Sequence, residues 1–67
     1  MNIETSFQKG LIAFMKRKNY TQTSLAEALG ITKMTVSYWV NGKHEPVLKD
    51  IKKLIAAGMT KKEIFGD

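Results

Sequence analysis

Between residues 33 and 38 the sequence carries one ammonium group, one thioether and three hydroxyl groups. They belong to Lys33, Met34, Thr35, Ser37 and Tyr38. An ammonium group donates hydrogen bonds, a hydroxyl group donates or accepts them, and the thioether and the tyrosine ring make apolar contacts. This is chemistry for the non-covalent recognition of another surface, provided that one element presents these side chains together.

Catalysis requires groups that this sequence lacks. With no Cys and a single His, the 67 residues supply neither a disulfide framework nor the ligand set of a zinc site. The sequence also has no paired carboxylates on one face and no Gly-rich phosphate loop, and so short a chain leaves little room for a substrate pocket. We therefore expect no enzymatic activity, no metal and no cofactor.

Length and charge narrow the class of protein further. A chain of 67 residues without disulfides predicts one domain, 1–67, held together by packing. Eleven Lys and Arg residues against six acidic ones give a net charge of +5, which favours a polyanionic partner, although many small soluble domains are equally basic. No apolar run approaches the roughly 20 residues that span a bilayer, and the N-terminus lacks the features of a signal peptide. We expect a cytoplasmic protein that does not engage membranes.

The recognition candidates lie in the segment GITKMTVSYWVNG, which is rich in the β-branched and aromatic residues typical of strands. Its apolar residues nevertheless follow a helical period, because Trp39 and Val40 come three and four residues after Val36. Burial of a Trp and a Val on one face outweighs the roughly few tenths of a kcal/mol that each Thr or Val costs a helix. We predict a helix over 33–41, capped by Thr32, with the recognition candidates opposite Val36 and Trp39.

Four further helices are predicted from the same period and from capping residues. A capping box at Thr5 opens the first helix, which ends in the basic triplet 16–18. That triplet either interacts with the helix dipole or lies near phosphate. Thr21 caps the second helix, over 22–29, and Gly30 ends it.

The fourth helix should run from about 48 to 57, and the fifth should follow a capping box at Thr60. The predicted core residues of the first, second and fourth helices are Ile3, Phe7, Leu11, Phe14, Met15, Leu25, Ala26, Leu29, Leu48, Ile51, Leu54 and Ile55. The predicted fold is therefore all-α, a compact bundle of about five short helices.

Residues 22–41 resemble the helix-turn-helix unit of the Cro and phage-repressor family. The residues that carry the resemblance are Leu25, Ala26, Leu29, Gly30, Ile31, Val36 and Trp39. Small Ala26 lets the two helices approach closely, and Gly30 permits a positive φ in the turn. The segment Asn41-Gly42-Lys43, followed by Pro46, is similar to the loop that follows the recognition helix in this family. The resemblance covers nearly the whole chain and implies a lambda-repressor-like DNA-binding domain.

The resemblance implies a role for each polar residue around the predicted helix 33–41. In this family the second helix of the unit lies in the major groove, so the base-contacting candidates are Lys33, Met34, Thr35, Ser37 and Tyr38. The phosphate-contacting candidates around it are Gln22, Thr32, Asn41, Lys43 and His44. For Tyr38 an alternative is that the ring packs on its neighbours, with its hydroxyl group in water.

The function implied is that of a Cro-like, phage-type repressor of transcription that binds a near-palindromic double-stranded DNA operator. One recognition helix reads few base pairs, so a homodimer is expected, formed either free or only on DNA, without a small-molecule ligand. Its predicted interface consists of Met59, Ile64 and Phe65, although Ile64 and Phe65 could instead close the monomer core. The alternative function is a protein-binding module of the same fold, an antirepressor or an antitoxin.

The sequence departs from the family pattern at two places. Val47 stands where the family usually has a capping Ser or Thr, so the residue at which the fourth helix starts is left undecided. Met15 and Val40 stand where the family commonly has an Arg and a Glu that form an ion pair. We predict that these two side chains instead make an apolar contact that replaces the pair.

Overall fold

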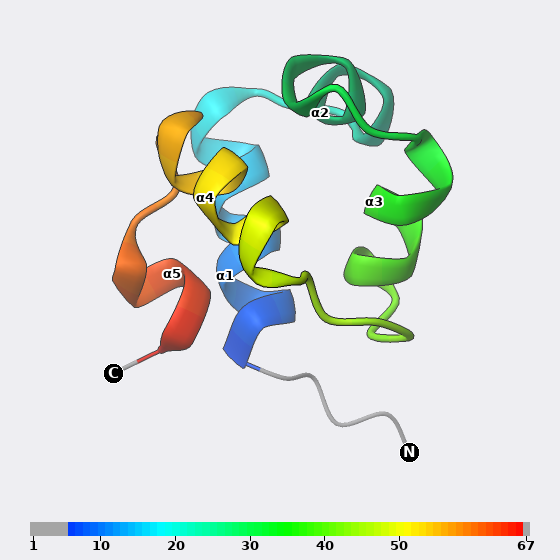
Figure 1. The fold of residues 1–67 in the computed structure, drawn as a ribbon. Helices are drawn as coiled ribbons and strands as arrows, with labels where there is room; N and C mark the ends of the chain where they lie inside the picture. Colours follow the sequence, from blue (N-terminus) through cyan, green and yellow to red (C-terminus); the bar gives the residue numbers. More distant parts are fainter. Residues whose placement is uncertain (1–5, 67) are drawn as a thin grey trace.

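The computed structural model describes residues 6–66, and within that range it contains five α-helices and no strand (Figure 1). The helices are α1 (Ser6–Lys18), α2 (Gln22–Leu29), α3 (Lys33–Val40), α4 (Leu48–Ala56) and α5 (Lys61–Phe65). The all-α prediction is confirmed, and the helix bounds agree with the predicted ones to within a residue or so. The predicted cap at Thr5 and the predicted core residue Ile3 lie outside the described residues.

Side-chain hydroxyl groups cap the N-terminal ends of α2 and α3, the two helices of the unit. Thr21 Oγ1 accepts a hydrogen bond from the Ser24 N–H at 3.0 Å, and Ser24 Oγ accepts one from the Thr21 N–H at 2.8 Å. After α2 the chain turns at Gly30, which has φ +70° and space around its Cα. Thr32 Oγ1 then accepts from the Thr35 N–H at 3.2 Å and starts α3. The predicted caps and turn are therefore in place.

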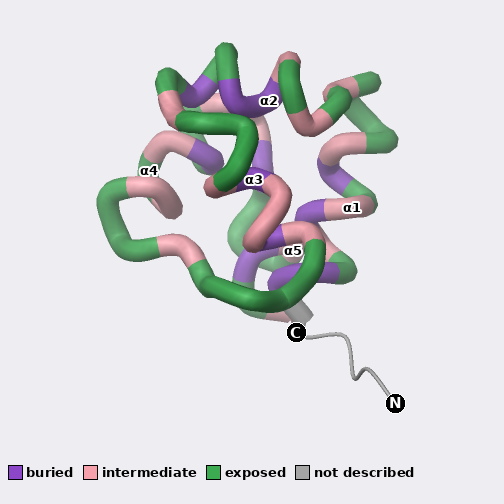
Figure 2. The backbone as a smooth tube through the Cα atoms, turned by 90° about the vertical axis from the view of Figure 1, so that its right-hand side faces the viewer, coloured by how far each residue is buried: buried purple, intermediate pink, exposed green. Residues whose placement is uncertain are grey.

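The core lies where α1, α2 and α3 meet and is closed by one side of α4 and α5 (Figure 2). Its buried apolar residues are Phe7, Leu11, Phe14, Leu25, Ala26, Leu29, Val36, Trp39, Leu54, Met59 and Ile64. The rings of Phe7 and Trp39 meet edge to face, with centroids 6.1 Å apart, and join α1 to α3. The predicted core positions on α2 are confirmed by the burial of Leu25, Ala26 and Leu29. Those on α3 are confirmed because Val36 and Trp39 are almost fully buried.

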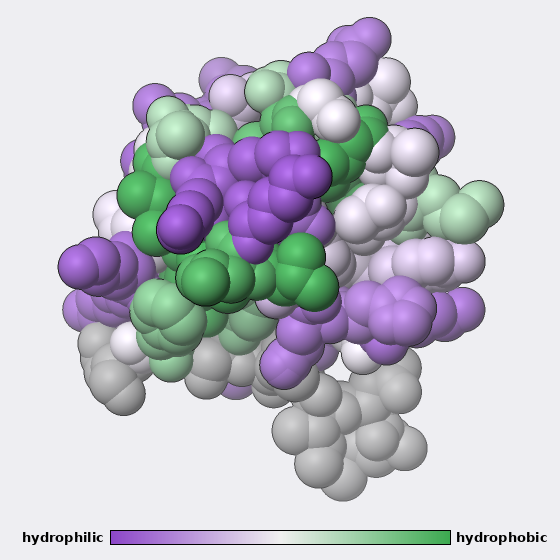
Figure 3. All heavy atoms as spheres, viewed as in Figure 1, coloured by the Kyte–Doolittle hydropathy of each residue, from purple (hydrophilic) through white to green (hydrophobic). Residues whose placement is uncertain are grey.

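The predicted core stripe of α4 is partly wrong. Leu54 is fully buried and Ile51 is partly buried, but Leu48 is 67% exposed and Ile55 is 41% exposed. The physical reason is the orientation of the helix about its axis. Leu48 and Ile55 lie nearly above one another, whereas Leu54 is about 120° away at about 100° per residue, so packing Leu54 inward turns the other two outward. Figure 3 shows apolar side chains on the surface over α4 and α5 beside hydrophilic ones.

The start of α4 needs no side-chain cap. Val47 makes no capping hydrogen bond through its side chain, yet α4 begins at Leu48. The Val47 carbonyl oxygen accepts the N–H groups of Asp50 at 2.9 Å and Ile51 at 3.0 Å, so backbone bonds alone close the first turn.

Close packing joins α5 to α1. A Cβ atom at Gly10, in the middle of α1, would overlap the carbonyl oxygen of Glu63, so only glycine fits there. Arg17 Nη2 lies 2.7 Å from Glu63 Oε1 and donates to the Gly58 carbonyl oxygen at 3.0 Å. Of the basic triplet 16–18, Arg17 therefore has a partner on α5, which neither interpretation of the triplet included.

This packing also bears on the predicted dimer interface, which stays a prediction. Met59 is 2% exposed and Ile64 is 4% exposed, because both close the core between α1 and α5. Little of either residue is exposed on the surface to a second molecule. Phe65 is 65% exposed and is the one interface candidate that remains on the surface.

Candidate nucleic-acid interface

The exposed side of α3 holds the candidates for base contact. Burial of Val36 and Trp39 on the inner side leaves Lys33 and Met34 exposed in the first turn, with Met34 63% exposed. The side chains at Thr35, Ser37 and Tyr38 are half-buried. The structure therefore brings the five candidates onto one helix and exposes the first two most. Figure 2 views the molecule from the side on which α3 lies.

Two of the hydroxyl groups on α3 already have partners within the chain. Thr35 Oγ1 lies 2.9 Å from Thr32 Oγ1, and Ser37 Oγ accepts a hydrogen bond from Asn41 Nδ2 at 3.3 Å. The same Asn41 group donates to the Ser37 carbonyl oxygen at 2.9 Å. A hydroxyl group can donate as well as accept, so these bonds orient the hydroxyl groups and leave hydrogen-bonding capacity for a ligand.

The phosphate candidates lie at the start of α2 and at both ends of α3. Gln22 is the first residue of α2 and is half-buried, whereas Thr32 is exposed and its hydroxyl group caps α3. Asn41, Lys43 and His44 are all exposed in the segment 41–44, which we call the α3 loop. The fold therefore places these candidates next to the elements that hold the base-contacting candidates.

Gln8, which the sequence predicted only as part of a capping box, links α1 to the α3 loop. Its Nε2 donates to the Val40 carbonyl oxygen at 3.2 Å, and its side chain is almost fully buried. Gly42 has φ +74°, and a Cβ atom there would come within 2.7 Å of Gln8 Nε2. A signal was present in the sequence, because Gln8 precedes Leu11 by three residues and so shares its inward face. Gln8 therefore contacts both the last residue of α3 and the start of the α3 loop.

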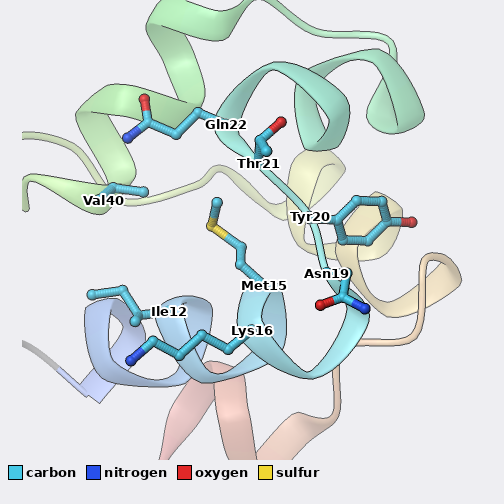
Figure 4. A pocket seen from close by; sticks show the side chains of 8 residues that line it. All are labelled: Ile12, Met15, Lys16, Asn19, Tyr20, Thr21, Gln22 and Val40. Atoms are coloured by element: carbon cyan, nitrogen blue, oxygen red, sulfur yellow. The ribbon is translucent and has the colours of Figure 1, made fainter.

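A surface hollow of about 400 Å³ separates α1 from the start of α2 and the end of α3 (Figure 4). It is lined by Ile12, Met15, Lys16, Asn19, Tyr20, Thr21, Gln22 and Val40. Figure 4 shows Met15 pointing from α1 toward the side of the hollow formed by Gln22 and Val40. Met15 and Val40 therefore face the same space, and their direct contact stays a prediction.

Positive charge is spread over several elements. The α3 side carries Lys33 and Lys43, and α4 adds exposed Lys49 and Lys52. The Lys53 Nζ atom lies 4.0 Å from Asp50 Oδ1 on the same helix.

No group of three or more His, Cys, Asp and Glu residues within 6–66 is arranged to hold a metal ion. None of the helices described there is long and apolar enough to cross a membrane.

A family model described as helix-turn-helix matches residues 11–57 of the 67, from α1 through the end of α4. The chain belongs to the Cro/C1-type helix-turn-helix family. Members of this family are DNA-binding proteins of the transcription-regulator type and are generally not enzymes. No curated protein and no solved structure gives a significant match to the chain. In this helix-turn-helix protein α2 is the first helix of the unit, α3 is the recognition helix, and α5 lies beyond the matched residues.

Proposed function

We propose that this helix-turn-helix protein is a Cro-like repressor of the phage type, which binds a near-palindromic operator in double-stranded DNA. The observation that carries the proposal is the orientation of α3 in a member of this family. Val36 and Trp39 are buried, so the opposite side of the recognition helix, including Lys33 and Met34, is presented outward. In this mode the N-terminal part of the helix reaches base edges in the major groove.

Four side chains of α3 that are not buried in the core have matching groups on DNA. Lys33 donates to guanine O6 and N7, and Met34 contacts a thymine methyl group. The hydroxyl groups of Thr35 and Ser37 donate to or accept from base edges. Around the helix, phosphate groups are contacted by Gln22, Thr32, Asn41, Lys43 and His44.

We further propose that two copies bind the operator together. A homodimer doubles the number of base pairs read, and it forms either free or only on DNA. Because Met59 and Ile64 are buried, the interface we propose combines Phe65 with the exposed apolar Val47 and Leu48. A hollow of about 110 Å³ is lined by Phe65 on α5 and by Pro46 and Ile51, which flank Val47 and Leu48 in the chain.

In this proposal no small-molecule ligand regulates repression. Repression would follow from protein concentration, competition for operators or a partner protein. The site of action we propose is the cytoplasm of a bacterial or phage-infected cell, where the operator DNA lies.

Selection of bound duplexes from a random DNA pool tests the proposed function. We expect enrichment of one half-site repeated with two-fold symmetry, and a steep fall in affinity for the enriched duplex as salt concentration rises. The same salt series on a scrambled duplex provides the control. If no sequence is enriched and the protein instead binds another protein with little salt dependence, the repressor proposal is wrong and a protein-binding module takes its place.

A further inference from the structure

We propose that Tyr38 is a positioning residue, whose ring and carbonyl group hold the α3 loop so that Lys43 and His44 lie beside the recognition helix. The proposal rests on the proposed DNA-binding function. It assigns Tyr38 an action through the loop rather than on a base, and so goes beyond the alternative left open by the sequence, in which the ring only packs on its neighbours.

Two side chains of the α3 loop contact the Tyr38 ring. The rings of Tyr38 and His44 have centroids 5.0 Å apart and planes inclined by 68°, which is an edge-to-face arrangement. The Lys43 Nζ atom lies over the Tyr38 ring, 6.0 Å from its centroid, at the outer limit of a cation–π interaction. Tyr38 is half-buried while Lys43 and His44 are exposed, so the ring is the more fixed partner.

The backbone of the loop is anchored to the same residue. The Tyr38 carbonyl oxygen accepts the Lys43 N–H at 2.9 Å and lies 3.5 Å from the His44 nitrogen, which also donates to it. The chain can return to this carbonyl because Gly42 has φ +74°, a conformation that side chains rarely adopt. Ring and carbonyl contacts from one residue therefore act on the same two loop residues.

The consequence for binding is that the α3 loop loses less conformational freedom when it contacts DNA. A free lysine on a flexible loop loses side-chain and backbone freedom when it contacts a phosphate group, and that loss weakens binding. If Tyr38 already holds Lys43 and His44, less freedom is lost when the DNA binds. The substitution of Tyr38 should therefore weaken contacts with phosphate groups, which are the same on every duplex, even though Tyr38 itself contacts no phosphate group.

The test compares Tyr38→Phe with Tyr38→Leu on a scrambled duplex over a series of salt concentrations. Phe keeps the ring and should bind within about twofold of the wild type, with the same dependence of log affinity on log salt. Leu removes the ring and should bind about three- to tenfold more weakly, with a flatter salt dependence. Lys43→Ala should then cost less affinity in the Leu background than in the wild type. Equal costs of Lys43→Ala in both backgrounds, or unchanged binding by the Leu variant, would overturn the proposal.

Nuclear magnetic resonance of the protein without DNA separates this proposal from the proposed function. In the wild type, nuclear Overhauser contacts should join the Tyr38 ring protons to the His44 ring and to the Lys43 methylene groups. The backbone order parameters of Lys43 and His44 should stay high in the Phe variant and fall in the Leu variant. If these contacts are absent in the wild type, the positioning role is overturned. This result does not depend on whether either variant folds. A wild type that shows these contacts but binds no duplex contradicts the proposed function alone.

Discussion

At the scale of single residues, Lys33 and Lys43 carry the same charge but lie on different parts of the interface. Lys33 is exposed in the first turn of α3, and Lys43 is exposed in the α3 loop. We predict that Lys33→Ala weakens operator binding by about 1 to 3 kcal/mol and relaxes the preference at one base pair of each half-site. Lys43→Ala should weaken binding to every duplex about equally and reduce the salt slope by roughly one unit for each phosphate group that the variant no longer neutralises.

The measurement is the affinity of both variants for operator and scrambled duplexes at fixed salt, after circular dichroism has established that they fold. Equal losses for the two variants on both duplexes would make Lys33 another residue that binds phosphate. Sequence preference would then depend on Met34, Thr35 and Ser37.

At the scale of the elements, α5 depends on its contacts with α1. We predict that Gly10→Ala lowers the free energy of unfolding by about 2 kcal/mol, because the added methyl group would overlap the Glu63 carbonyl oxygen, a backbone atom that cannot turn away. The gain in helix propensity of about 1 kcal/mol does not offset this overlap. Urea-induced unfolding measures the difference.

Gly30→Ala is the matched control for Gly10→Ala, since it also adds one methyl group. Space is open around Gly30, but its φ of +70° disfavours Ala, so we expect a loss of about 1 to 2 kcal/mol from backbone conformation alone. If Gly10→Ala is as stable as the wild type, α5 does not approach α1 as closely as described.

The Arg17–Glu63 pair makes the docking of α5 sensitive to acid. The hydrogen bond from Arg17 lowers the pKa of Glu63 below its ordinary value of 4.5, although desolvation opposes the shift; the Thr60 N–H also favours the charged form. Since the pKa is lower in the folded state, this stabilisation is fully present above pH 4.5 and is lost as pH falls through the lowered pKa.

We therefore predict that Glu63→Gln lowers stability at neutral pH and flattens the fall in stability below about pH 4.5. Thermal unfolding, scanned from about pH 2 to about pH 7, measures both effects. Glu27→Gln is a suitable control, because Glu27 is an exposed residue of α2. An unchanged acid limb in the Glu63 variant would contradict the contribution of the pair.

At the scale of the whole molecule, the size of the domain suits the proposed pairing on DNA. The Cα atoms span 30 × 23 × 23 Å, which is comparable with the roughly 34 Å, one turn of the duplex, that separates the recognition helices of a bound dimer. We predict that Phe65→Ser or Leu48→Ser weakens binding to a full operator by about tenfold, with the affinity for a single half-site unchanged. Both side chains are mostly exposed, so neither change should unfold the monomer.

Analytical ultracentrifugation with and without the operator measures the number of chains bound. Ile55→Ser provides the control, because Ile55 is also exposed but lies near the other end of α4. One chain bound per full operator at all protein concentrations would contradict the dimer, and an equal loss for the Ile55 variant would contradict the interface.

The sequence alone determined the helices, their caps and the buried side of the recognition helix. Thr21, Gly30 and Thr32 act on atoms within a few residues, and Val36 and Trp39 define a face by their spacing. Such local relations are visible in a linear chain because a helix repeats every 3.6 residues. For this reason α3 could be recognised as a helix despite its β-branched residues, and Lys33 and Met34 could be placed on its exposed side.

Only the tertiary structure decided how the helices are turned toward one another. The contacts from Gln8 to Val40 and from Arg17 to Glu63 join residues 32 and 46 positions apart, and helical spacing does not predict which of them meet. The orientation of α4 likewise buried Leu54 and exposed Leu48, although both belonged to one predicted stripe. Docking depends on the shapes of all the packed surfaces at once, because close packing leaves each helix few orientations and the sequence of one helix does not select among them.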